Sequence, residues 1–245
     1  MSSSAGPVGR STGDDVRWWN DQSLRPMIVA CTTLSMAVGV FGVSFGVGSV
    51  AAGASIAQTC ALSLLVFTGA SQFSAVSVIG AGGSFGSALG GALLLAARNG
   101  VYGLAMSRRI DGRLGTRLLA AQLTIDETTA MSVGQSDPRA QRIAFWFTGF
   151  ALYAFWNVGT LLGAVAGSAI DPTTYGLDAA FPAGFVAMVW PLLSDRRARQ
   201  AAVLGGMICL VAIPVTAVGV PILLSALAVL VGLQKPIPSP TGDPS

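Results

Sequence analysis

Three charged residues stand within long apolar stretches of the sequence: Arg98, Asp126 and Glu127. A charge at the centre of a bilayer costs roughly 2.5–3.5 kcal/mol on insertion scales, so such residues are rare unless they are paired or face a water-filled cavity. A guanidinium beside a carboxylate can form an ion pair, and a carboxyl group without a cationic partner can carry a proton. These residues are candidates for a functional site, and a structural ion pair between two helices is the alternative.

The spacing of these charges predicts that they lie at a similar depth. Arg98 precedes Arg108 by ten residues, and Asp126 follows Arg117 by nine residues. At 1.5 Å per helical residue, each is about 13–15 Å from the intervening basic loop and near the middle of a core about 30 Å thick. We therefore expect one acid to pair with Arg98. Neighbouring residues on a helix point about 100° apart, so we expect the other acid to face a wet cavity.

A second polar cluster lies in VFTGASQFS, residues 66–74, where Thr68, Gly69, Ser71 and Gln72 interrupt an apolar run. Discontinuous membrane helices expose backbone N–H groups, and the N-termini of half-helices attract carboxylates. The cluster is therefore a candidate docking place for a carboxylate. A glycine kink with hydrogen bonds between helices is equally consistent with these residues.

The elements that must position these residues are membrane helices. The chain has 245 residues, of which 52% are hydrophobic and only 10% charged, and no charged residue occurs in 26–97, 143–170 or 200–234. Soluble domains carry about 25% charged residues, and about 20 apolar residues cross a bilayer. Long apolar runs without alternation favour helices over barrel strands. We predict an all-α polytopic integral membrane protein with seven or eight hydrophobic segments, some of them discontinuous or re-entrant, at 27–50, 56–80, 85–106, 118–134, 143–169, 177–194, 200–216 and 218–234.

The composition also restricts the chemistry. The sequence contains no histidine, and its three cysteines lie in apolar segments without the spacing of metal ligands, so we expect neither a metal site nor a cofactor. The net charge of +3 comes mainly from short basic loops, which is a signal of membrane topology and not of nucleic-acid binding. We expect a polar tail at 1–25, a transmembrane transport domain at 26–234 and a disordered, proline-rich tail at 235–245.

The positive-inside rule predicts that the basic loops at 107–117, 135–142 and 195–199 are cytoplasmic, and that the acidic loop at 171–178 is outside. If so, 118–134 cannot cross once: either it enters the membrane and returns, or the positive-inside rule fails at one of these loops. The amino terminus is then expected outside, or inside if 118–134 spans. Gly42 and Gly46 form a small-xxx-small pair, which favours close helix packing over a helix break.

The order of several motifs resembles one family of membrane proteins. FGVSFG, VFTGASQF, LLLAARNGVYGLAMS and LAAQLTIDETTAM occur in this order, and the likeness runs from about residue 26 to 233. Together they are similar to the AzlC family, the large subunit of bacterial branched-chain amino-acid exporters. The positions that match the family are Gly69, Ser71, Gln72, Arg98, Tyr102, Asp126 and Glu127. Many relatives have Asn and His where this chain has Ala96 and Asn99.

The resemblance implies a multi-pass protein of the bacterial cytoplasmic membrane that is not an enzyme. It implies export of leucine, isoleucine, valine and sometimes methionine, use of the proton gradient, and a small hydrophobic partner of the AzlD type. In this reading the carboxylate of the amino acid meets the break at 68–72 or Arg98, and Asp126 or Glu127 receives the ammonium group or exchanges a proton. An intramembrane enzyme, or a channel-like or structural subunit, is the alternative. The aromatic residues Trp146, Tyr153, Trp156 and Trp190 are expected to be interface anchors or packing residues and not a ligand cage.

Overall fold

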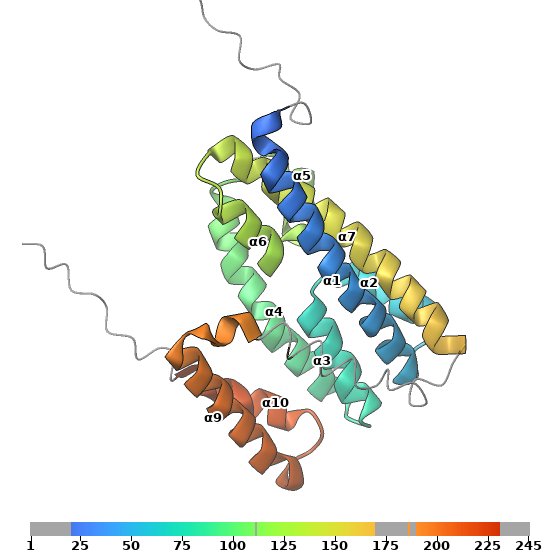
Figure 1. Cartoon of the computed structure of the whole chain (residues 1–245). Helices are drawn as coiled ribbons and strands as arrows, with labels where there is room; N and C mark the ends of the chain where they lie inside the picture. The colour runs from blue at the N-terminus through green and yellow to red at the C-terminus, as the bar shows by residue number, and fades with distance from the viewer. Residues whose placement is uncertain (1–20, 111, 170–185, 187–189, 231–245) are drawn as a thin grey trace, which may run out of the picture.

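The computed structural model describes residues 21–110, 112–169, 186 and 190–230, and this part of the chain is helical throughout its regular elements. Short 3₁₀ turns cover Gln22–Leu24, Trp190–Ser194, Ile213–Val215 and Ala226–Ala228. The α-helices, labelled in Figure 1, are α1 Arg25–Ala51, α2 Ile56–Leu65, α3 Gly69–Gly80, α4 Phe85–Ser107, α5 Leu114–Leu123, α6 Asp126–Val133, α7 Pro138–Ala169, α9 Arg196–Ala212 and α10 Val220–Ser225. The prediction of an all-helical chain is confirmed for these residues.

The two longest helices, α1 and α7, form the most extensive helix pair of the molecule (Figure 1). Glycines allow this close approach: a Cβ atom added at Gly46 would collide with the backbone of Thr160 and Ala164, and one added at Gly163 would collide with that of Val43. Helix α1 is continuous through its glycines. The packing interpretation of Gly42 and Gly46 is therefore confirmed, and a break at this place is excluded.

We expect Gly46→Val to prevent α1 from packing against α7. Overpacking a tight contact commonly costs about 1–3 kcal/mol, and a clash with backbone cannot be relieved by a rotamer change, so the loss should reach about 3 kcal/mol or more. The yield of monodisperse protein in detergent and its Tm would measure the effect. Gly206→Val on α9 is the matched control, because nothing lies within 4 Å of a Cβ at that position. Equal stability of the two variants would contradict the prediction.

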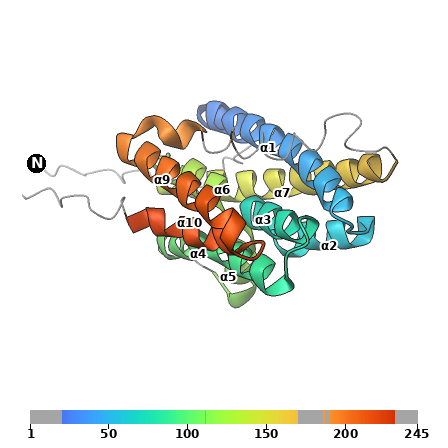
Figure 2. The ribbon, with the colours of Figure 1, turned by 90° about the horizontal axis from the view of Figure 1, so that it is seen from below.

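Between the long helices, two helical hairpins enter the molecule from opposite ends. Helices α2 and α3 start and finish beside the C-terminal end of α1: Ser49 Oγ lies 2.8 Å from Thr59 Oγ1, and a Cβ at Gly80 would lie 2.9 Å from that of Ala52. Figures 1 and 2 show both helices at this end. Helix α4 then returns to the other end, where the α5–α6 hairpin begins and finishes. A helix followed by a hairpin thus occurs twice in the chain, first as α1 with α2–α3 and then as α4 with α5–α6, and the two units run in opposite directions.

Both hairpins turn at β-branched residues, which lose side-chain freedom in a helix. Thr68 and Ile125, the residues before α3 and α6, are extended, with φ/ψ of −152°/95° and −135°/179°. At the second turn, Thr124 Oγ1 donates to Ala120 O at 2.7 Å. The hydroxyl oxygen of Thr128 accepts the Ile125 N–H at 3.0 Å. These bonds satisfy backbone groups that a continuous helix would have paired.

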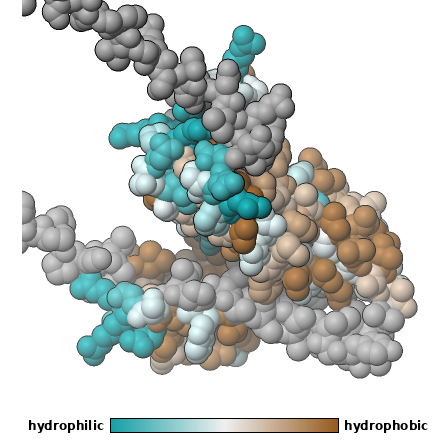
Figure 3. Space-filling view, turned by 45° about the horizontal axis from the view of Figure 1, so that its top comes forward, coloured by the Kyte–Doolittle hydropathy of each residue, from teal (hydrophilic) through white to brown (hydrophobic). Residues whose placement is uncertain are grey.

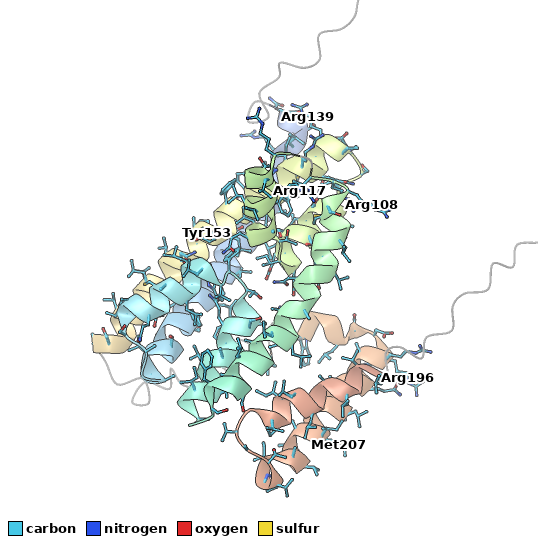
Figure 4. The ribbon with its side chains drawn as sticks, turned by 180° about the vertical axis from the view of Figure 1, so that it is seen from behind. Arg108, Arg117, Arg139, Tyr153, Arg196 and Met207 are labelled. Carbon is cyan, nitrogen blue, oxygen red and sulfur yellow. The ribbon has the colours of Figure 1, made fainter. Side chains whose placement is uncertain are left out.

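The ends of the α5–α6 hairpin lie on one side of the molecule. Arg109 Nε donates to Gln141 Oε1 at 3.1 Å, which joins the loop after α4 to the start of α7. Figure 4 shows Arg108, Arg117 and Arg139 at this end. In the described structure, residues 118–134 therefore start and finish at the end of the molecule that carries the basic loops.

The predicted side of the amino terminus has to be corrected. Asp21 Oδ2 lies 3.7 Å from Arg139 Nη1, so α1 begins at the end that carries the basic loops. Hydrogen bonds from the Ser23 hydroxyl and N–H hold the pKa of Asp21 below its usual range. A re-entrant 118–134 was expected to place the amino terminus on the opposite side. That expectation is wrong because 56–80, which was counted as a crossing, also turns back.

The apolar surface is that of a membrane protein. Three described helices are long and apolar enough to cross a membrane: Gln22–Ala51, Pro138–Ala169 and Arg196–Val215. Figure 3 shows hydrophilic residues gathered over the end with the basic loops and over the start of α9, and apolar residues over much of the remaining coloured surface. The predicted segment at 218–234 contains only short helical pieces up to residue 230, and 171–178, most of 177–194 and the tail at 235–245 lie outside the described residues.

Candidate functional site

The predicted ion pair joins α4 to the start of α6. Arg98 Nη1 lies 2.5 Å from Asp126 Oδ2, and the two side chains are 34% and 33% exposed. Glu127, the next residue, makes no ion pair within the described part of the chain. The predicted pairing of Arg98 with one acid is confirmed, and Asp126 is the acid that forms it.

The ion pair borders a small cavity where the two hairpins meet. The cavity offers about 30 Å³ to the centres of water molecules. A single water needs about 10–15 Å³ on this measure, so the cavity has room for about two or three waters and is too small for an amino acid. Its lining comes from Val38 of α1, Phe67 and the α3 residues Thr68, Gly69 and Ala70, Arg98 of α4, the α6 residues Ile125, Asp126 and Glu127, and Leu152 and Trp156 of α7.

Side-chain hydrogen bonds hold the tips of the two hairpins together. Gln122 Nε2 lies 3.2 Å from Leu64 O and 3.3 Å from Leu65 O, and Tyr153 Oη donates to Leu64 O at 3.0 Å. Gln72 Nε2 donates to Leu62 O at 3.0 Å across the first break. The last carbonyl groups of α2 therefore have side-chain partners where the chain leaves the helix.

The predicted site residues lie in three places relative to the central cavity. Thr68, Gly69, Arg98, Asp126 and Glu127 line the cavity together. Ser71 and Gln72 are each 1% exposed and lie behind the lining, where Gln72 supports the break. Tyr102 lies one turn beyond Arg98 on α4 and is outside the lining.

The apolar residues that line the central cavity were not predicted from the sequence. Val38, Phe67 and Leu152 lie in apolar runs with no feature that distinguishes lining residues from lipid-facing ones. Trp156 and Tyr153 were both expected to be interface anchors or packing residues. Trp156 is packed at 3% exposure and also borders the cavity. The Tyr153 hydroxyl donates to Leu64 O at the end of α2.

A second cavity, of about 360 Å³, lies between the C-terminal part of α4 and α5. It begins among residues of the basic end, including Ser107 and Arg117, and extends to Thr124. Thr124 directly precedes Ile125, which lines the central cavity. The tip of the α5–α6 hairpin therefore borders both cavities. Within the described residues, no group of three or more side chains could hold a metal ion.

Comparison of the sequence with known proteins identifies the family. The sequence model of the family described as AzlC protein matches residues 33–170, which include every residue that lines the central cavity. The chain belongs to the AzlC family. The expected resemblance is thereby confirmed, and the matched region of this AzlC protein runs from within α1 to the end of α7.

A relative of this AzlC protein is also a membrane protein. An uncharacterized membrane protein of Helicobacter pylori is 25% identical over 160 residues, which are 64% of this chain and 70% of the relative. No solved structure matches the chain.

Proposed function

We propose that this AzlC-family protein is a secondary transporter that exports branched-chain and other hydrophobic amino acids across the bacterial cytoplasmic membrane. The observation that carries the proposal is the central site, where an arginine, two acids and two interrupted helices meet at the tips of opposed hairpins. Transporters built from inverted repeats bind substrate and coupling ion at such a place. Family membership supports a transporter over an enzyme.

The small size of the central cavity supports an alternating-access mechanism. At about 30 Å³ it cannot hold an amino acid, so one hairpin tip has to move before a substrate enters. The second cavity offers a route from the basic end to the α5–α6 tip. Because basic loops mark the cytoplasmic side, this route favours loading from the cytoplasm and hence export. Movement of the α2–α3 tip would open the other side.

The lining suggests how a zwitterion with an apolar side chain is accommodated. Val38, Leu152 and Trp156 supply apolar surface for the side chain. Asp126 is neutralised by Arg98, whereas Glu127 has no cationic partner among the described residues. We assign Glu127 to bind either a proton or the ammonium group of the substrate. Competition between the two for one carboxylate would couple outward movement of the amino acid to inward movement of protons.

The proposed topology has two re-entrant hairpins, and cysteine labelling can test it. In a variant without the native Cys31, Cys60 and Cys209, single cysteines at Arg108 and Asp137 should react with an impermeant maleimide from the same side of the membrane. A cysteine at Ala54 should react from the opposite side. Labelling of positions 108 and 137 from opposite sides would show that α5–α6 spans, and would contradict the proposed fold in the membrane.

A flux assay tests the function itself. Proteoliposomes that contain the purified protein and the small AzlD-type subunit, which we propose as its partner, are loaded with labelled leucine. We expect saturable efflux that increases when the outside is more acidic than the inside, with unlabelled isoleucine and valine as competitors. Liposomes with either subunit alone test the need for the partner. Absence of efflux of any hydrophobic amino acid from liposomes with both subunits would refute the proposal.

A further inference from the structure

The two half-helices that begin at the central cavity differ in the charge of their first turns. The first turn of α6 carries two acidic residues, Asp126 and Glu127, whereas the first turn of α3 carries none. At the start of α3, Thr68 provides no side-chain cap, and Thr68 O accepts only from Ser71 and Gln72, both at 3.1 Å. The N–H groups of Gly69 and Ala70 are left without a partner in the described structure, although both residues line the cavity.

A side chain at the same place also has an unused donor. Trp156 is 3% exposed and lines the cavity, and its Nε1–H has no hydrogen-bond partner in the described structure. The six-membered part of its ring packs on the start of α3, since a Cβ at Gly69 would lie 3.0 Å from Trp156 Cη2. The first N–H groups of a helix are ordinarily free, but a buried side-chain donor without a partner is rare and costly. The unused Nε1–H of a residue that lines the cavity therefore points to an acceptor that binds there at another stage.

We propose that the N–H groups of Gly69 and Ala70 at the start of α3 bind the carboxylate of the transported amino acid. The inference rests on the proposed transport function and decides between the α3 break and Arg98 as the carboxylate site. The N-terminal end of a helix favours an anion through its unpaired N–H groups and its dipole. Arg98 is already engaged by Asp126, and α6 already holds two carboxylates of its own. The neutral hairpin therefore takes the substrate's anionic end and leaves Glu127 for its ammonium group.

If the N–H groups of Gly69 and Ala70 bind the substrate carboxylate, a substrate must have a carboxylate in order to bind well. Leucinol and leucinamide keep the side chain and amino group of leucine but have no carboxylate. Each would leave charge-assisted hydrogen bonds unmade, and such a bond contributes enough to change affinity about tenfold or more. We expect both analogues to compete with labelled leucine at least about tenfold less well than leucine itself.

One substitution removes a proposed donor without opposing the local backbone. Proline has no N–H and is favoured at the first position of a helix, and it requires an extended residue before it. Gly69 is the first residue of α3, and Thr68 before it is extended. Gly69→Pro should therefore leave α3 in place while it removes one N–H. Gly69→Ala is the matched control, because it also adds a Cβ against Trp156 but keeps the N–H.

The experiment measures inhibition of labelled-leucine exchange by leucine, leucinol and leucinamide in proteoliposomes with the small subunit. We expect Gly69→Pro to weaken leucine binding about tenfold while the analogues change little, so that discrimination is lost, and Gly69→Ala to retain it. Full discrimination in Gly69→Pro would overturn the carboxylate site but not the transport function. Equal inhibition by leucine and leucinol in the wild type would also overturn it, whether or not the variants fold. A wild type that exchanges no leucine would refute the transport function and this inference with it.

Discussion

Arg98→Gln is expected to abolish transport and to destabilise the protein. The substitution leaves the Asp126 carboxylate without its cation, and Asp126 Oδ1 is already buried without a partner. Breaking a fully buried pair costs about 3–5 kcal/mol, and an exposed pair contributes about 1 kcal/mol or less. Since each side chain of this pair is about one third exposed, we expect a loss of about 2 kcal/mol in stability. We expect the rate of leucine flux to fall about 100-fold or more, because the charge balance of the site is lost.

A second substitution separates the structural from the functional contribution of the pair. In Arg98→Gln with Asp126→Asn, no unpaired charge is left, so the Tm and the yield should recover while flux stays low. Arg108→Gln is the control for loss of an arginine from α4's end, since Arg108 lies in the exposed basic loop (Figure 4). Recovery of flux together with stability in the double variant would show that the pair is only a structural connection between α4 and α6.

The ion pair is the part of the site that the sequence predicts best. Counting residues from the basic loop placed Arg98 and Asp126 at one depth, and depth is a simple function of residue number along a helix. Two charges in an apolar medium then attract each other strongly enough to make their contact the expected outcome. The polar residues around Gly69 likewise indicated the first break.

The direction of the chain after Gly69 could not be predicted in the same way. Residues 56–80 are apolar and long enough to cross a membrane, and hydropathy reports the surroundings of a segment and not its path. Two short helices that return to one end bury the same residues as one straight helix. The turn depends on partners far away in the sequence, such as Gln122 and Tyr153, which bind the carbonyl groups at the end of α2. For this reason the side of the amino terminus was wrongly expected.

Which apolar residues line the central cavity could not be predicted from the sequence either. Leu152 and Phe155 are three residues apart on α7, yet Leu152 is 1% exposed at the central cavity and Phe155 is 38% exposed. In a soluble helix the polar face would have indicated the orientation, but α7 is apolar on all sides over most of its length. Only the packing against α1, fixed by glycines on both helices, determines which apolar residues face inward.

Glu127→Gln is expected to uncouple the protein from the proton gradient without unfolding it. Glutamine has nearly the same shape as glutamate but neither titrates nor carries charge, and Glu127 has no ion pair to lose in the described structure. Efflux of labelled leucine should therefore become insensitive to external acid, and its gradient-driven rate should fall about 100-fold. Leucine exchange should fall less, about tenfold, because one charged contact with the ammonium group is replaced by a neutral one.

The matched comparison uses an acid outside the site. Asp195→Asn, at the residue that caps the start of α9, also removes one negative charge. Asparagine caps a helix as well as aspartate does, so the flux and pH response of this variant should equal those of the wild type. The Tm of Glu127→Gln should stay within a few degrees of the wild type, which separates this variant from Arg98→Gln. Gradient-driven efflux at the wild-type rate in Glu127→Gln would exclude Glu127 as the coupling group. If Asp126→Asn, with its yield checked, were equally unaffected, neither acid could carry the proton, and the pair at the tip of α6 would have only a structural role.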